Sequence, residues 1–480
     1  MSTRIAAWLL FALFLFPDAY PGYGSFLRVD THADTLAAAL TKGFSRTDTA
    51  TLTTADGEIL RVEGASDTAR VRLYRFPSGA LVCQRQERAA ATVTIDFTGS
   101  GTVRWVENGV WVEKPSVTSG TQTLYIRLTD GGETRELIVN PPKMYRGAPL
   151  GCVEEIPASA GTVSVAENAG NVRVTIRVPL PPYAAWADWS VVYADTPLID
   201  WSNDTLRALW ANYDLSEKSR LTFDGCCYKI EPDYEPAGEN IFEYAPSMYV
   251  PNGMAQSGGS DAAFYLATVM LDLARSRYTD EGYFPTETRS LWLARDYGCA
   301  PGFFDTRFNT DTAYSYRKLG REYGIPAFLD VAERYTAYLL AHIETYGIPT
   351  ENGVLAPDYA GSGEPTHASL NHMLAEILYL YRDGSEEASS AADALLAGIA
   401  DLGRAWIRPN GNLHYAWLPD GSFGLEDYPY LTYNDLYNLQ SYLYETTGVQ
   451  NAAIDMLMHA KLAWMRGNGI TGYKTDLIGN

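Results

Sequence analysis

Tyrosine dominates the segment LEDYPYLTYNDLYNLQSYLYETTG, residues 425–448, where it is mixed with Asp427 and Asn434. A phenol can take up or release a proton, but its ordinary pKa of about 10 must fall before it can act as a base. A neighbouring cation, or hydrogen-bond donors to the phenolate, would lower that pKa. Tyr428 precedes the expected helix and follows an acid, so it is the best candidate for chemistry in this segment. Four other tyrosines recur at helical spacings and are expected to pack mostly in the core: Tyr430, Tyr433, Tyr437 and Tyr444.

Three further segments combine aromatic residues with His, Asn, Gln or Asp, and each lies between stretches of helical pattern. They are EYAPSMYVPNGMAQSGG, NGVLAPDYAGSGEPTHASLN and NGNLHYAWLPDGSF. Tyrosine has a flat apolar body and a polar tip, which suits a half-wet surface that holds sugar or peptide. Histidine, tyrosine and carboxylates are also the groups that transfer protons in enzymes. These loops are therefore the expected location of a site.

Taken in order, these segments resemble the D-glucuronyl C5-epimerase family. YVPNGMAQSGG resembles the family's Tyr-x-Pro-x-x-x-Ala-Gln-x-Gly segment. GEPTHASLNHMLAEILYLY is similar to a Pro-x-x-x-x-Leu-Asn-Gly motif that begins a helix. NGNLHYAWL followed by DYPYLTYNDLYNLQSY is similar to a Gly-x-Ile-Tyr-Asp-Leu segment and a later Asp-Tyr pair, and Tyr428 and Asn434 keep the family's spacing. The resemblance covers residues 245–470.

The resemblance implies an enzyme that inverts C5 of uronic acid residues in a polysaccharide or oligosaccharide. The proton on C5 is weakly acidic, so this reaction needs a base on one face of the sugar, an acid on the other, and donors for the carboxylate. By position, the resemblance implies Tyr415 and Tyr428 as acid and base, and Tyr359 is the nearest match, with a small offset, to a third family tyrosine. It implies substrate contact or positioning for Tyr249, Gln256, Asn371 and Asn434.

The chain departs from the family at its basic positions. Residues that are not basic occupy the places of family Arg and His residues: Leu418, Pro419, Leu425, Glu426, Pro429 and Thr432. His367 and His414 lie beside candidate residues and could replace part of this function, and Asp427 joins them as a substrate-binding candidate.

Three other functions stay open. A polysaccharide lyase begins with the same proton abstraction and then loses the group at C4. A glycoside hydrolase needs two carboxylates flanking one bond, and the loops supply Asp358, Glu364, Glu426 and Asp427. A non-catalytic glycan-binding or envelope protein would fit the thinned basic positions and the large β-rich region.

The elements that must position these residues change character near residue 195. Before it, short segments such as ATVTIDFTG and NVRVTIRVPLP alternate β-branched or aromatic residues with polar ones. TDGGE between two such runs predicts a hairpin. We expect a β-sandwich-like accessory region over 25–195, as one unit or as two modules with a break near 141–150.

After residue 195 the apolar residues recur with the helical period. Ser, Asn and Asp clusters precede two of these helices as N-caps. Gly324, Gly384 and Gly448 each end one helix just before the next begins, at intervals of 60 and 64 residues. Repeated helical hairpins predict an incomplete or closed (α/α) toroid over 196–480, the epimerase-like domain, with its polar loops gathered at one mouth.

The N-terminus, MSTRIAAWLLFALFLFPDAYPGYGS, has one Arg, an apolar run and then small residues, the layout of a secretory signal. We expect residues 1–24 to be a signal peptide or an uncleaved anchor, the protein to be secreted or in the cell envelope, and any membrane association to use this segment only. A net charge of −21 without a cluster of Lys and Arg argues against nucleic acid as a partner.

Neither the five cysteines nor the six histidines match a metal motif, and no Gly-rich phosphate loop follows a strand. We therefore expect no metal site and no organic cofactor, and leave structural calcium at loop aspartates open. Export would permit disulfides, with Cys83 and Cys152 as one pair and Cys226 or Cys227 reaching Cys299. The family resemblance also implies a homodimer.

Overall fold

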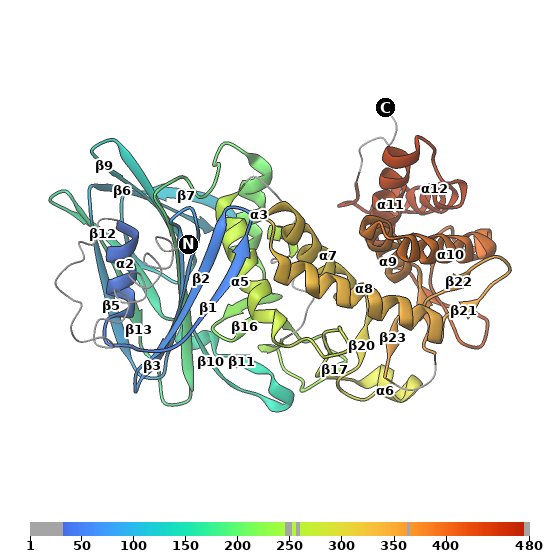
Figure 1. Ribbon diagram of the computed structural model, residues 1–480, viewed down its shortest axis with the longest axis horizontal. Helices are drawn as coiled ribbons and strands as arrows, with labels where there is room; N and C mark the ends of the chain where they lie inside the picture. The colour runs from blue at the N-terminus through green and yellow to red at the C-terminus, as the bar shows by residue number, and fades with distance from the viewer. Residues whose placement is uncertain (1–31, 245–251, 256–259, 362–364, 475–480) are drawn as a thin grey trace.

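The computed structural model describes residues 32–244, 252–255, 260–361 and 365–474. Figure 1 shows a β-rich part at one side and a row of helices that leads away from it to the C-terminus. The change from strands to helices along the chain agrees with the pattern of the sequence.

A large antiparallel sheet of 13 strands dominates the β-rich part. Its strands are β1 (Ser45–Thr54), β2 (Gly57–Ala65), β3 (Ala69–Arg75), β4 (Leu81–Glu87), β6 (Ser100–Glu107), β7 (Val110–Lys114), β9 (Leu124–Asp130), β10 (Glu133–Gly147), β11 (Val153–Glu155), β14 (Trp186–Ala194), β15 (Ser219–Thr222), β16 (Gly225–Lys229) and β18 (Ile241–Glu243). The main path runs β1-β2-β3-β4-β14-β10-β11-β18-β16-β15, and β9, β6 and β7 branch from β10.

A second sheet has the strand order β5-β13-β12-β8, formed by β5 (Ala91–Thr98), β8 (Val117–Gly120), β12 (Thr162–Asn168) and β13 (Asn171–Val178). Alternate residues of β13 are buried, as expected for a strand with one face on a core. Its valines share one apolar cluster with residues of β2, β3, β4 and β14 and with helix α2 (His32–Thr41). The two sheets therefore enclose a common core.

The hairpin predicted at TDGGE is confirmed. β9 and β10 pair antiparallel, with Asp130 opposite Glu133. Gly131 and Gly132 have positive φ values of 58° and 92°, the backbone that a tight type I′ turn requires. Glycine adopts this backbone at no steric cost.

The large sheet does not stop near residue 195, because β15, β16 and β18 extend it with residues 219–243. The break expected near 141–150 falls on β10, which runs through residue 147 with a register shift between Asn140 and Lys143. A shift of this kind lets a strand carry Pro141 and Pro142 without ending, since proline is tolerated at bulges.

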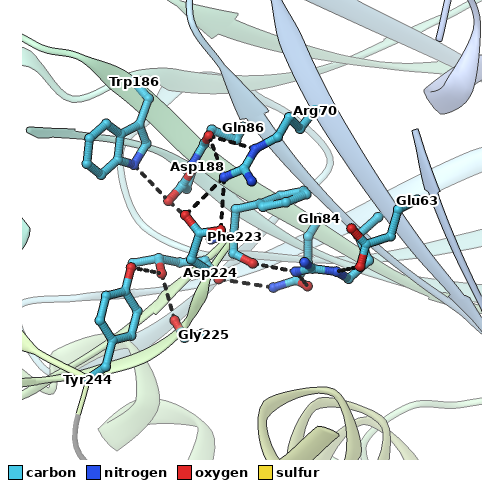
Figure 2. Close-up of polar contacts among 12 residues, drawn as sticks. Glu63, Arg70, Gln84, Gln86, Trp186, Asp188, Phe223, Asp224, Gly225 and Tyr244 are labelled. Carbon is cyan, nitrogen blue, oxygen red and sulfur yellow. Dashed lines mark hydrogen bonds and ion pairs between the residues drawn. The ribbon is translucent and has the colours of Figure 1, made fainter. Parts of the chain in front are cut away.

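Figure 2 shows how the turn between β15 and β16 is fixed on the sheet. Arg70 on β3 binds Asp224 at 2.9 Å, and Asp188 on β14 accepts a hydrogen bond from the Phe223 backbone at 3.1 Å. The guanidinium groups of Arg70 and Arg72 lie 4.5 and 4.3 Å from the centre of the Phe223 ring. These contacts hold the β15–β16 turn against strands β3 and β14 of the same sheet.

The helices after residue 195 follow segments of helical pattern, except α6, which the sequence did not predict. They are α3 (Asp204–Leu215), α5 (Asp261–Arg275), α6 (Leu291–Tyr297), α7 (Thr306–Glu322), α8 (Pro326–Tyr346), α9 (Leu370–Asp383), α10 (Glu386–Leu402), α11 (Leu431–Thr447) and α12 (Ala452–Gly467), with short 3-10 turns at Pro149–Gly151, Pro157–Ser159 and Gly403–Trp406. Asn203 and Ser260 cap α3 and α5 through their side chains, as the cap clusters predict. Gly384 and Gly448 end α9 and α11 in the left-handed conformation.

The helices form hairpins α7–α8, α9–α10 and α11–α12, and α7, α9 and α11 also pack on one another in that order. α5 lies on the large sheet, where Leu266 and Met270 share a core with Tyr74 and Val192. The row therefore starts on the sheet and ends near the C-terminus (Figure 1). This arrangement agrees with the predicted helical repeat.

The tyrosine stripe of α11 is only partly in the core, contrary to expectation. Tyr433 is buried, whereas Tyr430 is 42% exposed. Tyr437 and Tyr444 are half-buried. Leucines occupy the core positions of α11 instead, at Leu436, Leu439 and Leu443.

The predicted disulfides are wrong, because all five cysteines lie in the described part of the chain and are buried free thiols. Cys83 belongs to the core between the sheets, and Cys152 to a small separate cluster. Cys226 and Cys227 point to opposite faces of β16, and Cys299 lies in another cluster. The fold therefore places each thiol in a different apolar environment.

Gly398 on α10 should not tolerate a side chain. A Cβ there would overlap the carbonyl oxygen of Val354 in β22 (Val354–Leu355), where strand and helix backbones touch. Since backbone cannot move aside cheaply, Gly398→Ala should destabilise the protein by about 1–3 kcal/mol or more, measured by urea unfolding. Gly467→Ala in α12 is the matched control, because no atom lies within 4 Å of its Cβ position. Equal destabilisation by both substitutions would contradict this packing.

Within the described residues, no helix combines the length and the apolar character needed to cross a membrane.

Candidate functional site

Short strands bring the candidate loops together at the start of helices α7, α9 and α11. β20 (Phe304–Asp305) pairs with β23 (Tyr359–Ala360), just before α7. β24 (Ala368–Ser369) pairs with β25 (His414–Trp417), and β25 with β26 (Phe423–Glu426). These ladders fix the α6–α7, α8–α9 and α10–α11 loops against one another.

Asp358 is the fully buried centre of this region. Its Oδ1 accepts a hydrogen bond from the backbone N–H of Ser369 at 2.6 Å. Its Oδ2 lies 3.1 Å from His367 Nε2 and 3.7 Å from His372 Nε2. On its other side, His367 Nδ1 lies 3.2 Å from Tyr297 Oη. Tyr297, His367 and Asp358 thus form a chain from a half-buried phenol to a buried carboxylate, which we call the Tyr–His–Asp chain.

Aromatic rings surround His367. The ring centres of Trp292, Tyr297, Tyr359 and Tyr415 lie 5.5, 5.6, 5.7 and 5.7 Å from the imidazole centre. Trp292, Tyr297 and Tyr415 are half-buried, so parts of this wall reach solvent.

The wall continues outward from Tyr415 to Tyr428. Their rings meet edge to face at 5.6 Å, and Tyr428 is 46% exposed. Two of the predicted acid/base residues are therefore adjacent, and Tyr415 links the exposed phenol of Tyr428 to His367. Tyr359, the third predicted catalytic residue, is buried in the same wall.

The environment fixes the charges of these groups. Burial would raise the pKa of Asp358, but the imidazoles of His372 and His367 outweigh it and lower that pKa. Burial lowers the pKa of His372 to about 4. Burial raises the pKa of Tyr415 well above its usual range, and Asp358 and Tyr428 add to the effect. At neutral pH the site therefore holds an ionised Asp358, a neutral His372 and a protonated phenol at Tyr415.

Asp427, predicted to bind substrate, lies in a buried ion pair. Its Oδ2 is 2.7 Å from Lys461 Nζ, with both side chains almost fully buried. Thr432 donates to its Oδ1 at 2.6 Å. Lys461 also donates to the carbonyl of Tyr428 at 2.6 Å. This geometry fixes the loop that carries Tyr428 and leaves Asp427 little freedom to meet a substrate.

The other predicted residues either have separate contacts or lie outside the described part of the chain. Asn371 is buried on α9, with its Oδ1 unsatisfied. Asn434 accepts a hydrogen bond from the Lys474 backbone at 2.9 Å. His414 stacks on Phe423 at 4.9 Å. Tyr249 and Gln256 lie outside the described residues.

The sequence did not identify three residues of the site as candidates for proton transfer: Tyr297, Asp358 and His372. Asp358 was considered only as a hydrolase carboxylate. Tyr297 ends α6 and lies 70 residues from His367 in sequence. No motif joins two such distant positions, but the clustering of Asp, Tyr and His over 358–372 is a signal that could have pointed to Asp358 and His372.

Over the described residues, no group of three or more His, Cys, Asp or Glu side chains is arranged to hold a metal ion.

Comparison with known proteins finds no matching family model and no similar curated protein. Among solved structures, a D-mannose isomerase is 14% identical over 45% of this chain and 58% of its own, with a TM-score of 0.34. A cellobiose 2-epimerase from Bacillus thermoamylovorans B4167 is 11% identical over 46% and 57%, with a TM-score of 0.32. A family 76 glycoside hydrolase from a bovine Bacteroides thetaiotaomicron strain is 11% identical over 81% and 75%, with a TM-score of 0.37.

All three are carbohydrate-processing enzymes by name, and none of them is a glucuronyl C5-epimerase. The chain spans less than two thirds of the length of the D-mannose isomerase and of the cellobiose 2-epimerase. At these TM-scores, the chemistry of the chain has to be argued from its own residues.

Proposed function

We propose that this protein is a carbohydrate-modifying enzyme that transfers a proton at a carbon next to a carboxylate, and that it inverts C5 of uronic acid residues in a glycan. The observation that carries the proposal is the Tyr–His–Asp chain inside a wall of aromatic side chains. An ionised carboxylate stabilises an imidazolium, and an imidazole can accept a proton from a phenol. This set of groups supports proton transfer through a tyrosine. His367 can accept the proton of Tyr297, a contact that the sequence did not predict.

In the proposed first half-reaction, Tyr297 Oη takes the proton from C5 while its own proton passes to His367 Nδ1. The electron pair of the broken C–H bond moves into the sugar carboxyl group. His367 becomes an imidazolium, and the negative charge of Asp358, 3.1 Å from its Nε2, stabilises it. The rise in charge on the sugar is thus matched by a cation that forms inside the protein.

In the second half-reaction, a phenol on the other side of the sugar returns a proton to C5. Tyr415 and Tyr428 are the candidates, because Tyr415 contacts His367 at 5.7 Å between ring centres and Tyr428 contacts Tyr415 at 5.6 Å. The raised pKa of Tyr415 keeps it protonated and able to donate. The aromatic faces of Trp292 and Tyr428 would hold the sugar rings.

A second candidate is proton transfer on a neutral sugar, next to a carbonyl group. Arg307 at the start of α7 forms ion pairs with Asp311 at 3.0 Å and with Asp435 at 2.7 Å. Asp305 and Asp358 are also buried, and burial together with the charge of Asp358 raises the pKa of Asp305 to about 7. This surplus of carboxylates favours a substrate without negative charge, because a uronate would need a free cation.

The experiment that tests both candidates is proton NMR in D2O with the full chain, a panel of uronic-acid polysaccharides and a panel of neutral sugars. Deuterium entering C5 of a uronan with the chain intact would support the epimerase, and a 4,5-unsaturated product would instead mean a lyase. Deuterium entering only next to the carbonyl of neutral sugars would support the second candidate. No exchange with any substrate would overturn both.

Tyr428→Phe removes one hydroxyl and keeps the ring. Because this hydroxyl is a proposed proton donor, exchange at C5 should fall by about 10²-fold. Tyr430→Phe is the matched control, since Tyr430 is similarly exposed, at 42% against 46%, and lies two residues away. Unchanged exchange in Tyr428→Phe would remove Tyr428 from the mechanism and leave Tyr415 as the donor.

We also propose secretion through residues 1–24, which rests on the layout of that segment, and a homodimeric state, which rests only on the resemblance to the epimerase family. Detection of the mature protein outside the cytoplasm and its mass in solution would test them.

A further inference from the structure

A surface cavity lies on the β-rich part of the protein, apart from the Tyr–His–Asp chain. Its volume is about 470 Å³, within the range of about 300–1,000 Å³ that small-molecule sites occupy. Its polar and aromatic lining consists of Arg127 from β9, Asp200, Trp201 and Ser202 from the loop between β14 and α3, and Asp261 from α5. Figure 1 shows α3 and α5 beside the large sheet, whereas α6, which carries part of the aromatic wall, lies well away from it.

Buried hydrogen bonds hold the loop that forms the cavity. Glu136 on β10 is almost fully buried, accepts a hydrogen bond from the Leu198 backbone N–H at 2.7 Å, and binds Arg127 at 2.7 Å. The hydroxyl of Ser260, the N-cap of α5, donates to the carbonyl of Leu198 at 3.0 Å. Groups that are already fixed lose little conformational freedom when they bind a ligand. The cavity is therefore a preformed feature of the fold.

Trp201 gives the cavity one aromatic side. Its ring meets Trp111 and Tyr125 edge to face at 5.0 and 5.4 Å, and the guanidinium of Arg104 lies 4.8 Å from its centre. The side chain is half-buried, so these neighbours leave part of it accessible. An accessible indole offers an apolar surface on which the C–H groups of a sugar ring can pack.

Two carboxylates line the same space. Asp200 accepts hydrogen bonds from the N–H and the hydroxyl of Ser202 at 2.9 and 2.6 Å, both through Oδ1. Burial raises the pKa of Asp261. Within the part of the chain that the structure describes, neither carboxylate is paired with a Lys or Arg. The cavity therefore offers carboxylate oxygens as acceptors for the hydrogen bonds of a ligand.

This lining fits a neutral sugar better than a charged ligand. The two carboxylates would repel a uronate or a phosphate. A cation would meet the guanidinium of Arg104, which already lies over the Trp201 ring, and that of Arg127. A neutral sugar has hydroxyls that donate to carboxylates and accept from Ser202, together with an apolar ring face for Trp201.

We propose that this cavity is a second glycan-binding site, which holds a neutral sugar unit through Trp201, Asp200 and Asp261. The inference goes beyond the proposed function, because it concerns binding on the β-rich part and no step of proton transfer. Two separate sites on one chain would strengthen the hold on a polysaccharide, since binding at the first makes binding at the second intramolecular.

The experiment is saturation-transfer NMR, followed by calorimetric titration, on the full chain. The probes are neutral oligosaccharides of glucose, mannose, galactose and xylose, and uronic-acid oligosaccharides for comparison. A neutral oligosaccharide should bind to the wild type through this cavity. Asp200→Asn keeps an oxygen that accepts from Ser202 but removes the charge, so the Kd for that sugar should rise by about tenfold.

Asp420→Asn is the matched control. Asp420 accepts hydrogen bonds from the N–H and the hydroxyl of Ser422 at 3.0 and 2.6 Å, in the same kind of turn, but it does not line the cavity. Its Kd should equal that of the wild type. Trp201→Phe keeps an aromatic ring against Trp111 and Tyr125 but offers a smaller surface, so it should also weaken binding of the neutral sugar.

Equal affinity in the wild type, Asp200→Asn and Trp201→Phe, or no binding of any neutral oligosaccharide, would overturn the inference. Binding of calcium or spermine that is lost in Asp200→Asn, without binding of sugars, would identify a cation site and would also overturn it. A cavity that binds sugar in a protein that exchanges no substrate proton would overturn the proposed function and leave this inference standing.

Discussion

Replacing His367 with glutamine should lower the rate of deuterium exchange into substrate by about 10²–10⁴-fold, the usual contribution of one acid–base group. His367 is the link in which both nitrogens are used, with Asp358 at 3.1 Å on one and Tyr297 at 3.2 Å on the other. Glutamine can keep a contact with each neighbour but cannot hold the extra proton. The loss should appear in the rate of exchange far more than in substrate affinity, because the group acts when the C–H bond breaks.

His459→Gln is the matched control. His459 also lies beside a carboxylate, with Asp455 at 3.3 Å, but its side chain is 74% exposed on α12. Exchange rates in this variant should equal those of the wild type. If His367→Gln folds normally and exchanges at the wild-type rate, the Tyr–His–Asp chain is a structural feature and the proposed function loses its central observation.

The helical half of the molecule could be predicted because its signals are local. Ser260 caps α5 by accepting from Ala263, and Gly384 and Gly448 end α9 and α11. A cap acts within one turn, so the short sequence around it contains the information. The same holds for the β9–β10 turn.

The site could be predicted only in part because its contacts are long-range. The sequence indicated the loops, and it identified Tyr359, Tyr415 and His367, which the fold brings together. Tyr297 could not be found in this way, since its contact with His367 spans 70 residues and depends on the packing of α6. The cysteine pairing failed for the same reason, because the distance between two thiols is a property of the fold.

Asp427 shows what a local pattern leaves out. Its place beside Tyr428 in an aromatic loop indicated substrate binding, but its carboxylate forms an ion pair with Lys461 of α12. Burial lowers the pKa of Lys461 and raises that of Asp427, while each partner opposes the effect on the other. Their 2.7 Å contact, together with the hydrogen bond from Lys461 to the carbonyl of Tyr428, holds the loop.

Lys461→Met should therefore cause a large loss of stability. Methionine is similar in size, but it leaves the Asp427 carboxylate buried without its cation, and Tyr428 and Asn412 lose a donor. Breaking a buried pair from one side costs about 3–5 kcal/mol, which urea unfolding would measure. Lys218→Met is the control, because the Lys218–Glu231 pair is 52% and 47% exposed, and such surface pairs contribute about 0–1 kcal/mol.

The double variant Lys461→Met/Asp427→Asn distinguishes two causes of the lost stability: a buried carboxylate without its cation, and lost packing around Lys461. Asparagine removes the charge and can still accept the hydrogen bond from Thr432, so the double variant should recover part of the stability lost in Lys461→Met. A double variant less stable than Lys461→Met would mean that packing around Lys461, and not the ion pair, fixes this loop. Asp427 would then again be a candidate for contact with substrate.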